Sequence, residues 1–401
     1  MRFARALGAF GAVSILLLPA ASLAAEMRGV TATEIRIGQT MPYSGPVSAF
    51  GALGKGEVGF FKMLNEKGGI NGRKVNLISL DDSYAPPKSV EQTRRLVESD
   101  EVALIFSSIG TAHNTAIAKY LQSKNVPQLF IGSGASKFAD IAQYPQATMG
   151  VQAPFRYEAR LYARYALAKN PNAKFAVISQ NDDYGRDYLA GLKDVLGEKY
   201  DSVVTNATYE IQDPTIDSQI VKLKASGADV FVIAATPKFA AQAIRKSFEI
   251  GWRPMTFLSN VAVWVSTVME PAGPEAGTGI LSTAYVKDPD DPAWKDDPGV
   301  KGWREFMTKY VPEADQHDTN YVNSYNSAMA LEAVLKACGD DLSTENILKQ
   351  AFSIRDLELP MLLPGIKVNT GTTDHVPVDQ MQFMRFNGKS WERFGELQTG
   401  N

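Results

Sequence analysis

The residues best suited to chemistry in this chain are small polar groups that follow expected strands. Residues 132–136 read Gly-Ser-Gly-Ala-Ser and come directly after the apolar run 127–131. A short helical pattern, 137–141, follows them, so free backbone N–H groups and two hydroxyls could bind a carboxylate without any formal charge. Gly110 and Thr111 also stand between an apolar run and a helical pattern.

Neighbouring parallel strands end at the same edge of a sheet, so these two loops could converge on one acidic group. The alternative is that both loops only cap the helices that follow them. A third segment, 182–185, reads Asp-Asp-Tyr-Gly and places Tyr184 where it could face a cleft between two halves of the chain. Its alternative is a surface turn with Asp183 as the helix N-cap.

Patterns that match catalytic or cofactor motifs stand in the wrong structural context. Residues 54–59 fit G-x-G-x-x-G, but a dinucleotide fingerprint needs its glycines directly after a strand, and the expected strand ends near Met41. These glycines therefore predict close helix packing. Residues 132–136 lack the G-x-S-x-G register of a serine hydrolase, and no G-x-x-x-x-G-K-[ST] phosphate loop occurs. The three histidines, His113, His317 and His375, do not have zinc-binding spacing, so we expect no metal site. Because none of these motifs is in place, we also expect no cofactor and no enzymatic activity.

The N-terminal residues are typical of a secretory signal peptide. Two arginines precede the uncharged run 6–18, and Ser22 and Ala24 suit cleavage that would remove residues 1–24. No cysteine follows the run, so we expect a periplasmic protein without a lipid anchor. A buried N-terminal helix is the alternative.

Composition narrows the possible partners. Loss of two arginines with the leader changes the charge balance from 41 − 44 = −3 to 39 − 44 = −5, which gives no electrostatic reason to bind nucleic acid or an anionic bilayer. The single cysteine, Cys338, forbids an internal disulfide and lies in an apolar helical stretch, which predicts a core position. The remaining chain is too long for one ordinary core and suggests two lobes.

The chain alternates short β-rich runs with helical patterns, which predicts an α/β protein with parallel sheets. A first round covers 34–131, and a second runs from Val151 to a return segment at 280–286. Helices expected at 300–310 and 321–338 would return to the first lobe. The dipeptide Asn-Gly at 387–388 predicts a C-terminal hairpin.

The chain resembles the type I periplasmic solute-binding proteins of the branched-chain (hydrophobic) amino acid ABC importer family, the leucine/isoleucine/valine-binding type. The resemblance rests on the segments 37–38, 42–46, 50–51, 65–72, 81–82, 125–127, 133–136 and 183–185, with weaker similarity at 227–229 and 325–328. It covers essentially the whole chain after the leader, although only 68–72 and the loop at Ser133 are distinctive alone.

This resemblance implies two Rossmann-like lobes joined by three hinge crossovers, with closure around a ligand. We expect an N-terminal lobe of 25–150 and 284–363 and a C-terminal lobe of 151–283 and 364–401. The implied partners are a small carboxylate and the permease subunits of an inner-membrane importer, with the protein as a monomer.

By position, the resemblance implies that Thr111 holds the ligand carboxylate and that the loop after Ser133 does the same. Phe50 would line the pocket from the first lobe, and Tyr184 would cover the ligand from the second. Thr236, or Ala235 beside it, matches a further contact. The full expected ligand-binding set is Phe50, Gly110, Thr111, Ser133, Gly134, Ala135, Ser136, Tyr184, Thr236 and Asn260.

One departure from the family bears on the ligand. Amino acid binders carry an acidic residue for the ammonium shortly after the strand that follows Gly251, whereas 256–264 contains no acid. A buried ammonium without a counter-charge costs several kcal/mol. We therefore rank aromatic acids first, medium-chain aliphatic acids second and amino acids third. Candidate wall residues, each with core packing as the alternative, are Phe50, Tyr84, Tyr184, Trp264 and Tyr285.

Two other functional classes use α/β folds of this kind. An α/β enzyme that handles sugars or nucleotides is disfavoured by the signal peptide and by the missing catalytic set and phosphate loop. A sensor ectodomain that reports a solute to a membrane receptor would use the same fold, and the fold does not separate sensing from import.

Overall fold

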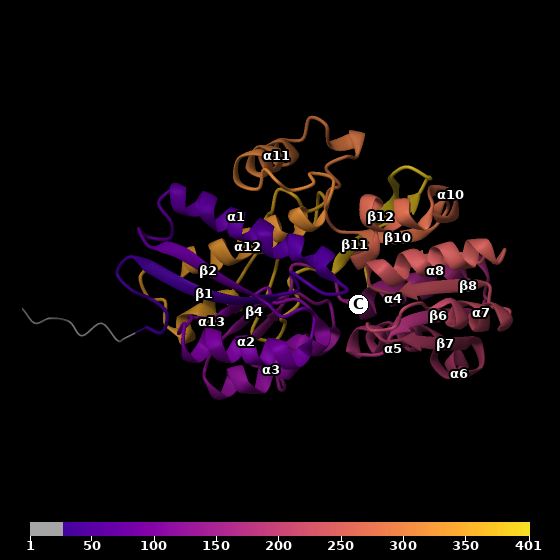
Figure 1. The fold of residues 1–401 in the computed structure, drawn as a ribbon, viewed down its shortest axis with the longest axis horizontal. Helices are drawn as coiled ribbons and strands as arrows, with labels where there is room; N and C mark the ends of the chain where they lie inside the picture. The colour runs from indigo at the N-terminus through magenta and orange to yellow at the C-terminus, as the bar shows by residue number, and fades with distance from the viewer. Residues whose placement is uncertain (1–26) are drawn as a thin grey trace, which may run out of the picture.

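The computed structural model describes residues 27–401, so the expected signal peptide at 1–24 lies outside the described residues. Two sheets form two lobes that lie side by side along the long axis of the molecule (Figure 1). Within the described chain, no helix has the length and apolar character needed to cross a membrane. The predicted two-lobed α/β fold is confirmed.

The first lobe contains a five-stranded parallel sheet in the order β2-β1-β3-β4-β5. Its strands are β1 (Glu34–Met41), β2 (Lys74–Asp81), β3 (Ile105–Phe106), β4 (Gln128–Ile131) and β5 (Ala147–Met149). Its first helices are α1 (Gly51–Glu66), α2 (Pro86–Glu98) and α3 (Thr111–Ser123). Figure 1 shows α1 on one face of the sheet and α2 and α3 on the other.

The second lobe contains a seven-stranded sheet in the order β12-β11-β10-β9-β8-β6-β7. Its strands are β6 (Phe175–Gln180), β7 (Val204–Tyr209), β8 (Val230–Ala234), β9 (Met255–Leu258), β10 (Leu281–Ala284), β11 (Gln380–Phe386) and β12 (Trp391–Thr399). β6 to β10 are parallel, and β11 and β12 form the predicted antiparallel hairpin. β6 and β8 are buried along their whole length, which explains their continuous apolar runs.

Helices cover both faces of the second sheet. α4 (Phe155–Lys169) and α5 (Asp183–Leu196) share one apolar core, and α7 (Asp217–Ala225) and α8 (Pro237–Glu249) share the other. Shorter elements are α6 (Tyr200–Val203), α9 (Glu270–Ala272), α10 (Pro274–Gly277), the 3-10 turns η1 (Ser48–Phe50), η2 (Ser136–Ala139), η3 (Gly197–Lys199), η4 (Asn260–Ala262) and η6 (Pro292–Trp294), and the π-helix η5 (Val265–Met269).

The chain passes between the lobes after β5, after β10 and before β11. Between the last two passages it forms α11 (Pro298–Tyr310), α12 (Asn320–Ala337) and α13 (Thr344–Ala351). Trp303, Leu331 and Ile347 of these helices join Ile37 and Phe106 of the first sheet in one core. The late helices therefore return to the first lobe, as predicted.

The glycines of the G-x-G-x-x-G pattern let α1 pack closely against its neighbours. A Cβ at Gly56 would lie 2.0 Å from Ser324 Oγ on α12, and one at Gly54 would lie 2.3 Å from Tyr43 Oη. The predicted packing role of these glycines is confirmed. Sequence reasoning missed β5, α13 and η5.

Candidate functional site

A cavity of about 90 Å³ lies between the lobes. The first lobe lines it with segments that follow β3, β4 and β5, and the second lobe with segments that follow β6, β8 and β9. Open α/β sheets bind ligands at this carboxyl end of their strands.

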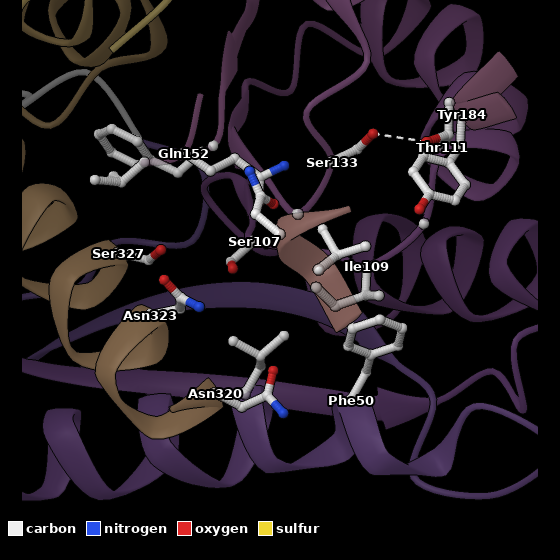
Figure 2. A pocket seen from close by; sticks show the side chains of 18 of the residues that line it. Phe50, Ser107, Ile109, Thr111, Ser133, Gln152, Tyr184, Asn320, Asn323 and Ser327 are labelled. Atoms are coloured by element: carbon white, nitrogen blue, oxygen red, sulfur yellow. Dashed lines mark hydrogen bonds between the residues drawn. The ribbon is translucent and has the colours of Figure 1, made fainter. Parts of the chain in front are cut away.

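Thr111 and Ser133 join the two loops of the first lobe at the cavity. Their hydroxyl oxygens lie 2.7 Å apart, so the loops after the neighbouring strands β3 and β4 converge as predicted (Figure 2). Gly110 precedes α3 with a φ of 107°, and a Cβ there would lie 2.2 Å from His113 Nδ1, so the turn requires glycine. The first N–H groups of a helix lack partners within that helix and carry its positive dipole end. This end of the cavity therefore suits an anion.

Within residues 27–401, several buried side-chain donors have no hydrogen-bond partner, and three of them belong to residues that line the cavity. These three are Tyr184 Oη, Gln152 Nε2 and Asn260 Nδ2. Burial raises the pKa of Tyr184 well above its ordinary value, so its hydroxyl stays protonated and can donate. A carboxylate accepts hydrogen bonds only, so three free donors match it.

Gln152 was not predicted as a site residue. It follows β5, a three-residue strand that the sequence did not reveal. No sequence signal marked Gln152, because the strand before it was not recognised. Figure 2 shows Gln152 over the cavity between Ser133 on one side and Asn323 and Ser327 of α12 on the other.

Aromatic rings form much of the cavity wall. All five predicted wall residues line the cavity: Phe50, Tyr84, Tyr184, Trp264 and Tyr285. Phe50 of the first lobe meets Trp264 of the second edge-on, with ring centroids 5.2 Å apart at 83°. The ring of Phe155 packs edge-on against the ring of Tyr184, with centroids 4.7 Å apart. The wall is therefore built by rings of both lobes.

Three residues of the cavity wall have a strained backbone. Tyr84, Ser107 and Phe130 have φ angles of 56°, 50° and 51°, a left-handed conformation that side chains other than glycine seldom adopt. Each such residue costs on the order of 1–3 kcal/mol, which the surrounding structure must offset. All three residues line the cavity.

The structure corrects one part of the predicted site, because Gly134, Ala135 and Ser136 lie outside the cavity lining. The Ser136 N–H donates to Asp187 Oδ2 of the second lobe at 3.0 Å, and its hydroxyl donates to the same carboxylate. The Ala135 N–H donates to Ser133 Oγ at 3.2 Å. The amides expected to hold a ligand therefore hold a side chain of the protein, because η2 turns toward α5.

Capping of α5 differs from the suggested alternative. Asp182, rather than Asp183, accepts hydrogen bonds from the N–H groups of Tyr184 and Gly185, at 3.0 and 3.3 Å. Asp183 instead pairs across the lobes with Lys137 at 2.6 Å. Tyr184 is left to face the cavity.

Thr236 and Asn260 bring the second lobe to the cavity. The Thr236 N–H donates to Tyr209 Oη at 2.9 Å, and the two hydroxyls lie 3.2 Å apart. The Asn260 N–H donates to the buried Glu158 at 3.2 Å. Both residues are thus held through their backbones while they line the cavity.

Among the described residues that line the cavity, none is Asp, Glu, Lys, Arg or His. Two buried carboxyls lie behind the wall. Burial raises the pKa of Glu57 to about 8, although bonds from Ser107 and Gln39 act in the opposite direction. Burial raises the pKa of Glu158 to about 7 in the same way. Neither presents its carboxyl to the cavity, so a bound ammonium would find no facing counter-charge.

The described part of the chain contains no group of three or more His, Cys, Asp and Glu side chains that could hold a metal ion.

Comparison with known proteins places this geometry in a family. The model of the periplasmic binding protein family matches residues 34–390. A Leu/Ile/Val-binding protein homolog of Brucella abortus is 24% identical over 352 residues, which cover 85% of this chain and 86% of the relative.

Two solved structures share the fold. A branched-chain amino acid ABC transporter protein from Thermus thermophilus with bound valine has a TM-score of 0.80 at 16% identity, over 92% of this chain and 97% of its own. A solute-binding protein of an ABC transporter from R. palustris in complex with benzoate has a TM-score of 0.74 at 20% identity, over 90% and 96%. The chain therefore belongs to the periplasmic binding protein family.

Proposed function

We propose that this protein captures a small carboxylic acid with an aromatic or hydrophobic body and delivers it to the permease of an ABC importer. The observation that carries the proposal is the set of unpartnered donors at the cavity, Tyr184 Oη, Gln152 Nε2 and Asn260 Nδ2. They face the same space as the Thr111–Ser133 pair and the start of α3.

Charge supports an acid over an amino acid. A carboxylate can be held by oriented N–H and O–H groups alone, as at many helix N-termini. An ammonium has only donors and needs acceptors or an opposite charge. The carboxyl of Glu158 is engaged behind the wall by Tyr162, Tyr188, Thr283 and the Asn260 N–H, so it does not serve that role.

The apolar wall supports an aromatic or hydrophobic body. Phe50, Trp264 and Tyr285 supply ring faces and edges, and Ile109 and Val261 add aliphatic surface. The neighbours with this fold bind benzoate in one case and valine in another, so the fold alone does not select the ligand. Medium-chain aliphatic acids rank second and amino acids third.

We propose that the acid first binds the first lobe and that the second lobe then closes over it. The moving bodies would be 25–150 with 284–363 and 151–283 with 364–401, in a periplasmic, monomeric protein without a nucleic-acid partner. Contacts between the lobes, such as Lys137 with Asp183, would hold the closed form.

A thermal-unfolding screen tests the proposal. Benzoate, C4–C8 aliphatic acids, leucine and valine would each be added, with benzyl alcohol and benzamide as matched compounds without a carboxylate. A ligand at a hundredfold excess over Kd stabilises the folded form by about 2.7 kcal/mol. We expect shifts with the acids and none with the uncharged analogues. Shifts with leucine and valine but not with any acid would contradict the proposal.

A further inference from the structure

A second, larger compartment adjoins the ligand cavity within the same interlobe space. It has a volume of about 650 Å³, against about 90 Å³ for the inner cavity. Four residues line both spaces: Asn260, Trp264, Tyr285 and Asn323. The two spaces therefore adjoin along a wall formed by these side chains.

Trp264 is the largest side chain of this shared wall. Its residue is only 4% exposed, and its ring meets Phe50 of the opposite lobe edge-on at 5.2 Å. The contact closes the inner cavity from both lobes at once. A longer ligand that extended from the inner cavity into the outer compartment would have to displace the indole.

The loop that carries Trp264 is fixed independently of the indole. Trp391 Nε1 donates to the Val263 carbonyl at 2.6 Å. The Trp264 carbonyl accepts from the N–H groups of Val268 and Met269, at 3.0 and 3.1 Å. Shortening the Trp264 side chain therefore removes the partition without removing the bonds that hold its backbone.

The outer compartment has apolar surface that could receive the tail of a ligand. This surface comes from Val263, Val265, Ala284, Met384 and Trp391. Charged groups at the same compartment include Asp291 and Arg393, which pair at 3.2 Å, and Asp290 and His317, which pair at 2.6 Å.

We infer that Trp264 divides the interlobe space and sets the maximum length of the acid that the protein binds. This inference rests on the proposed function and adds a specificity-determining residue to it. With the indole in place, the body of the ligand is confined to the inner cavity. With the indole removed, a tail can pass into the outer compartment and bury its methylenes there.

A chain-length series tests the inference. Benzoate, phenylacetate, 3-phenylpropanoate and 4-phenylbutanoate would be titrated calorimetrically into the parent protein, Trp264→Ala and Trp264→Phe. In the parent we expect affinity to fall as the chain lengthens. In Trp264→Ala we expect affinity to rise with chain length instead, by about fourfold for each methylene that is buried in the outer compartment. Trp264→Phe keeps a ring in the wall and should lie between the two.

Met384→Ala is the matched control, because Met384 lines only the outer compartment. It should leave the order of the parent unchanged. If Trp264→Ala weakens all four acids by the same factor, or if the parent prefers the longest acid, the inference is wrong. If Trp264→Ala does not fold, Trp264→Phe decides the question. The inference is then wrong if Trp264→Phe ranks the four acids with the same affinity ratios as the parent. If the parent binds neither the four aromatic acids nor any aliphatic acid, the proposed function is wrong and the inference fails with it.

Discussion

The carboxylate of Asp187 on α5 accepts a 3.0 Å hydrogen bond from the N–H of Ser136 in the opposite lobe. One turn earlier on the same helix, Asp183 pairs with Lys137 at 2.6 Å. These two contacts form an interlobe latch beside the ligand cavity. Because the latch exists only when the lobes meet, its free energy adds to that of the ligand in favouring closure.

We expect Asp187→Asn to weaken ligand binding about tenfold, since a hydrogen bond to a charged group contributes about 1.5–3 kcal/mol and the amide retains part of it. Asp194→Asn on the same helix is the control, because within the described chain Asp194 pairs only with Arg156 and Arg160, which belong to its own lobe. It should leave affinity unchanged. Calorimetric titration measures both variants, and equal affinities for Asp187→Asn and the parent would exclude the latch.

Tyr184→Phe should lower affinity for the acid about tenfold while leaving the free energy of unfolding unchanged or higher. Tyr184 Oη has no hydrogen-bond partner in the described chain, so its removal breaks no bond within the protein. The substitution removes only the hydrogen bond that the hydroxyl would donate to the ligand. Tyr209→Phe provides the contrast, since the Tyr209 hydroxyl accepts from the Thr236 N–H. That variant should lose stability. Urea unfolding and calorimetric titration separate the two effects, and undiminished affinity in Tyr184→Phe would place the ligand elsewhere.

Asn260→Asp should shift the ligand preference of the site from aromatic acids toward amino acids. The substitution keeps the size of the side chain and replaces an unpartnered donor at the cavity by a negative charge. We expect affinity for aromatic acids to fall at least tenfold through repulsion and that for leucine or valine to rise through a new ammonium contact. Asn260→Leu is the control, because it loses the donor without adding charge. Gain of amino acid binding in both variants would contradict this explanation.

Glu57→Gln should flatten the pH dependence of stability. Burial holds the pKa of Glu57 at about 8 in the folded protein, well above the ordinary value of 4.5 that applies on unfolding. The folded form keeps its proton between these values, so the free energy of unfolding falls as pH rises, by about 1.4 kcal/mol per unit for this group. Its contribution is complete below about pH 4.5 and is lost by about pH 8.

Urea unfolding at several pH values between 5 and 8.5 measures the effect. The difference in stability between Glu57→Gln and the parent should grow with pH and level off above about pH 8. Glu66→Gln on the same helix is the control, since hydrogen bonds from Tyr310 and Lys309 lower the pKa of Glu66 below this range. Parallel curves for the parent and Glu57→Gln would show that Glu57 does not titrate in this way.

Sequence patterns predicted the parts of this protein that depend on local rules. Strands such as β8 (Val230–Ala234) are continuous apolar runs, and α1 stops at the glycines 68–69, so both were expected. β5 spans three residues and α13 only eight, too short for a periodic pattern to stand out. Gln152 was missed for the same reason, because its importance follows from the strand before it.

The site required information that spacing does not contain. The convergence of Thr111 and Ser133 follows from strand adjacency, which parallel topology makes predictable. The path of residues 134–136 does not, because it depends on an acid more than fifty positions later, Asp187 on the opposite lobe. Local motifs describe what a loop can bind, whereas only the docked lobes determine which carboxylate it binds.

A cavity wall without ionised side chains, within the described chain, has a consequence for the surroundings in which the protein works. Dissolved ions weaken attraction between exposed charges over about 10 Å at 0.1 M, but they hardly affect short contacts with oriented dipoles that are shielded from water. The contacts between the acid and the cavity wall should therefore vary little with salt, whereas the partly exposed Lys137–Asp183 pair of the latch should weaken as salt is added.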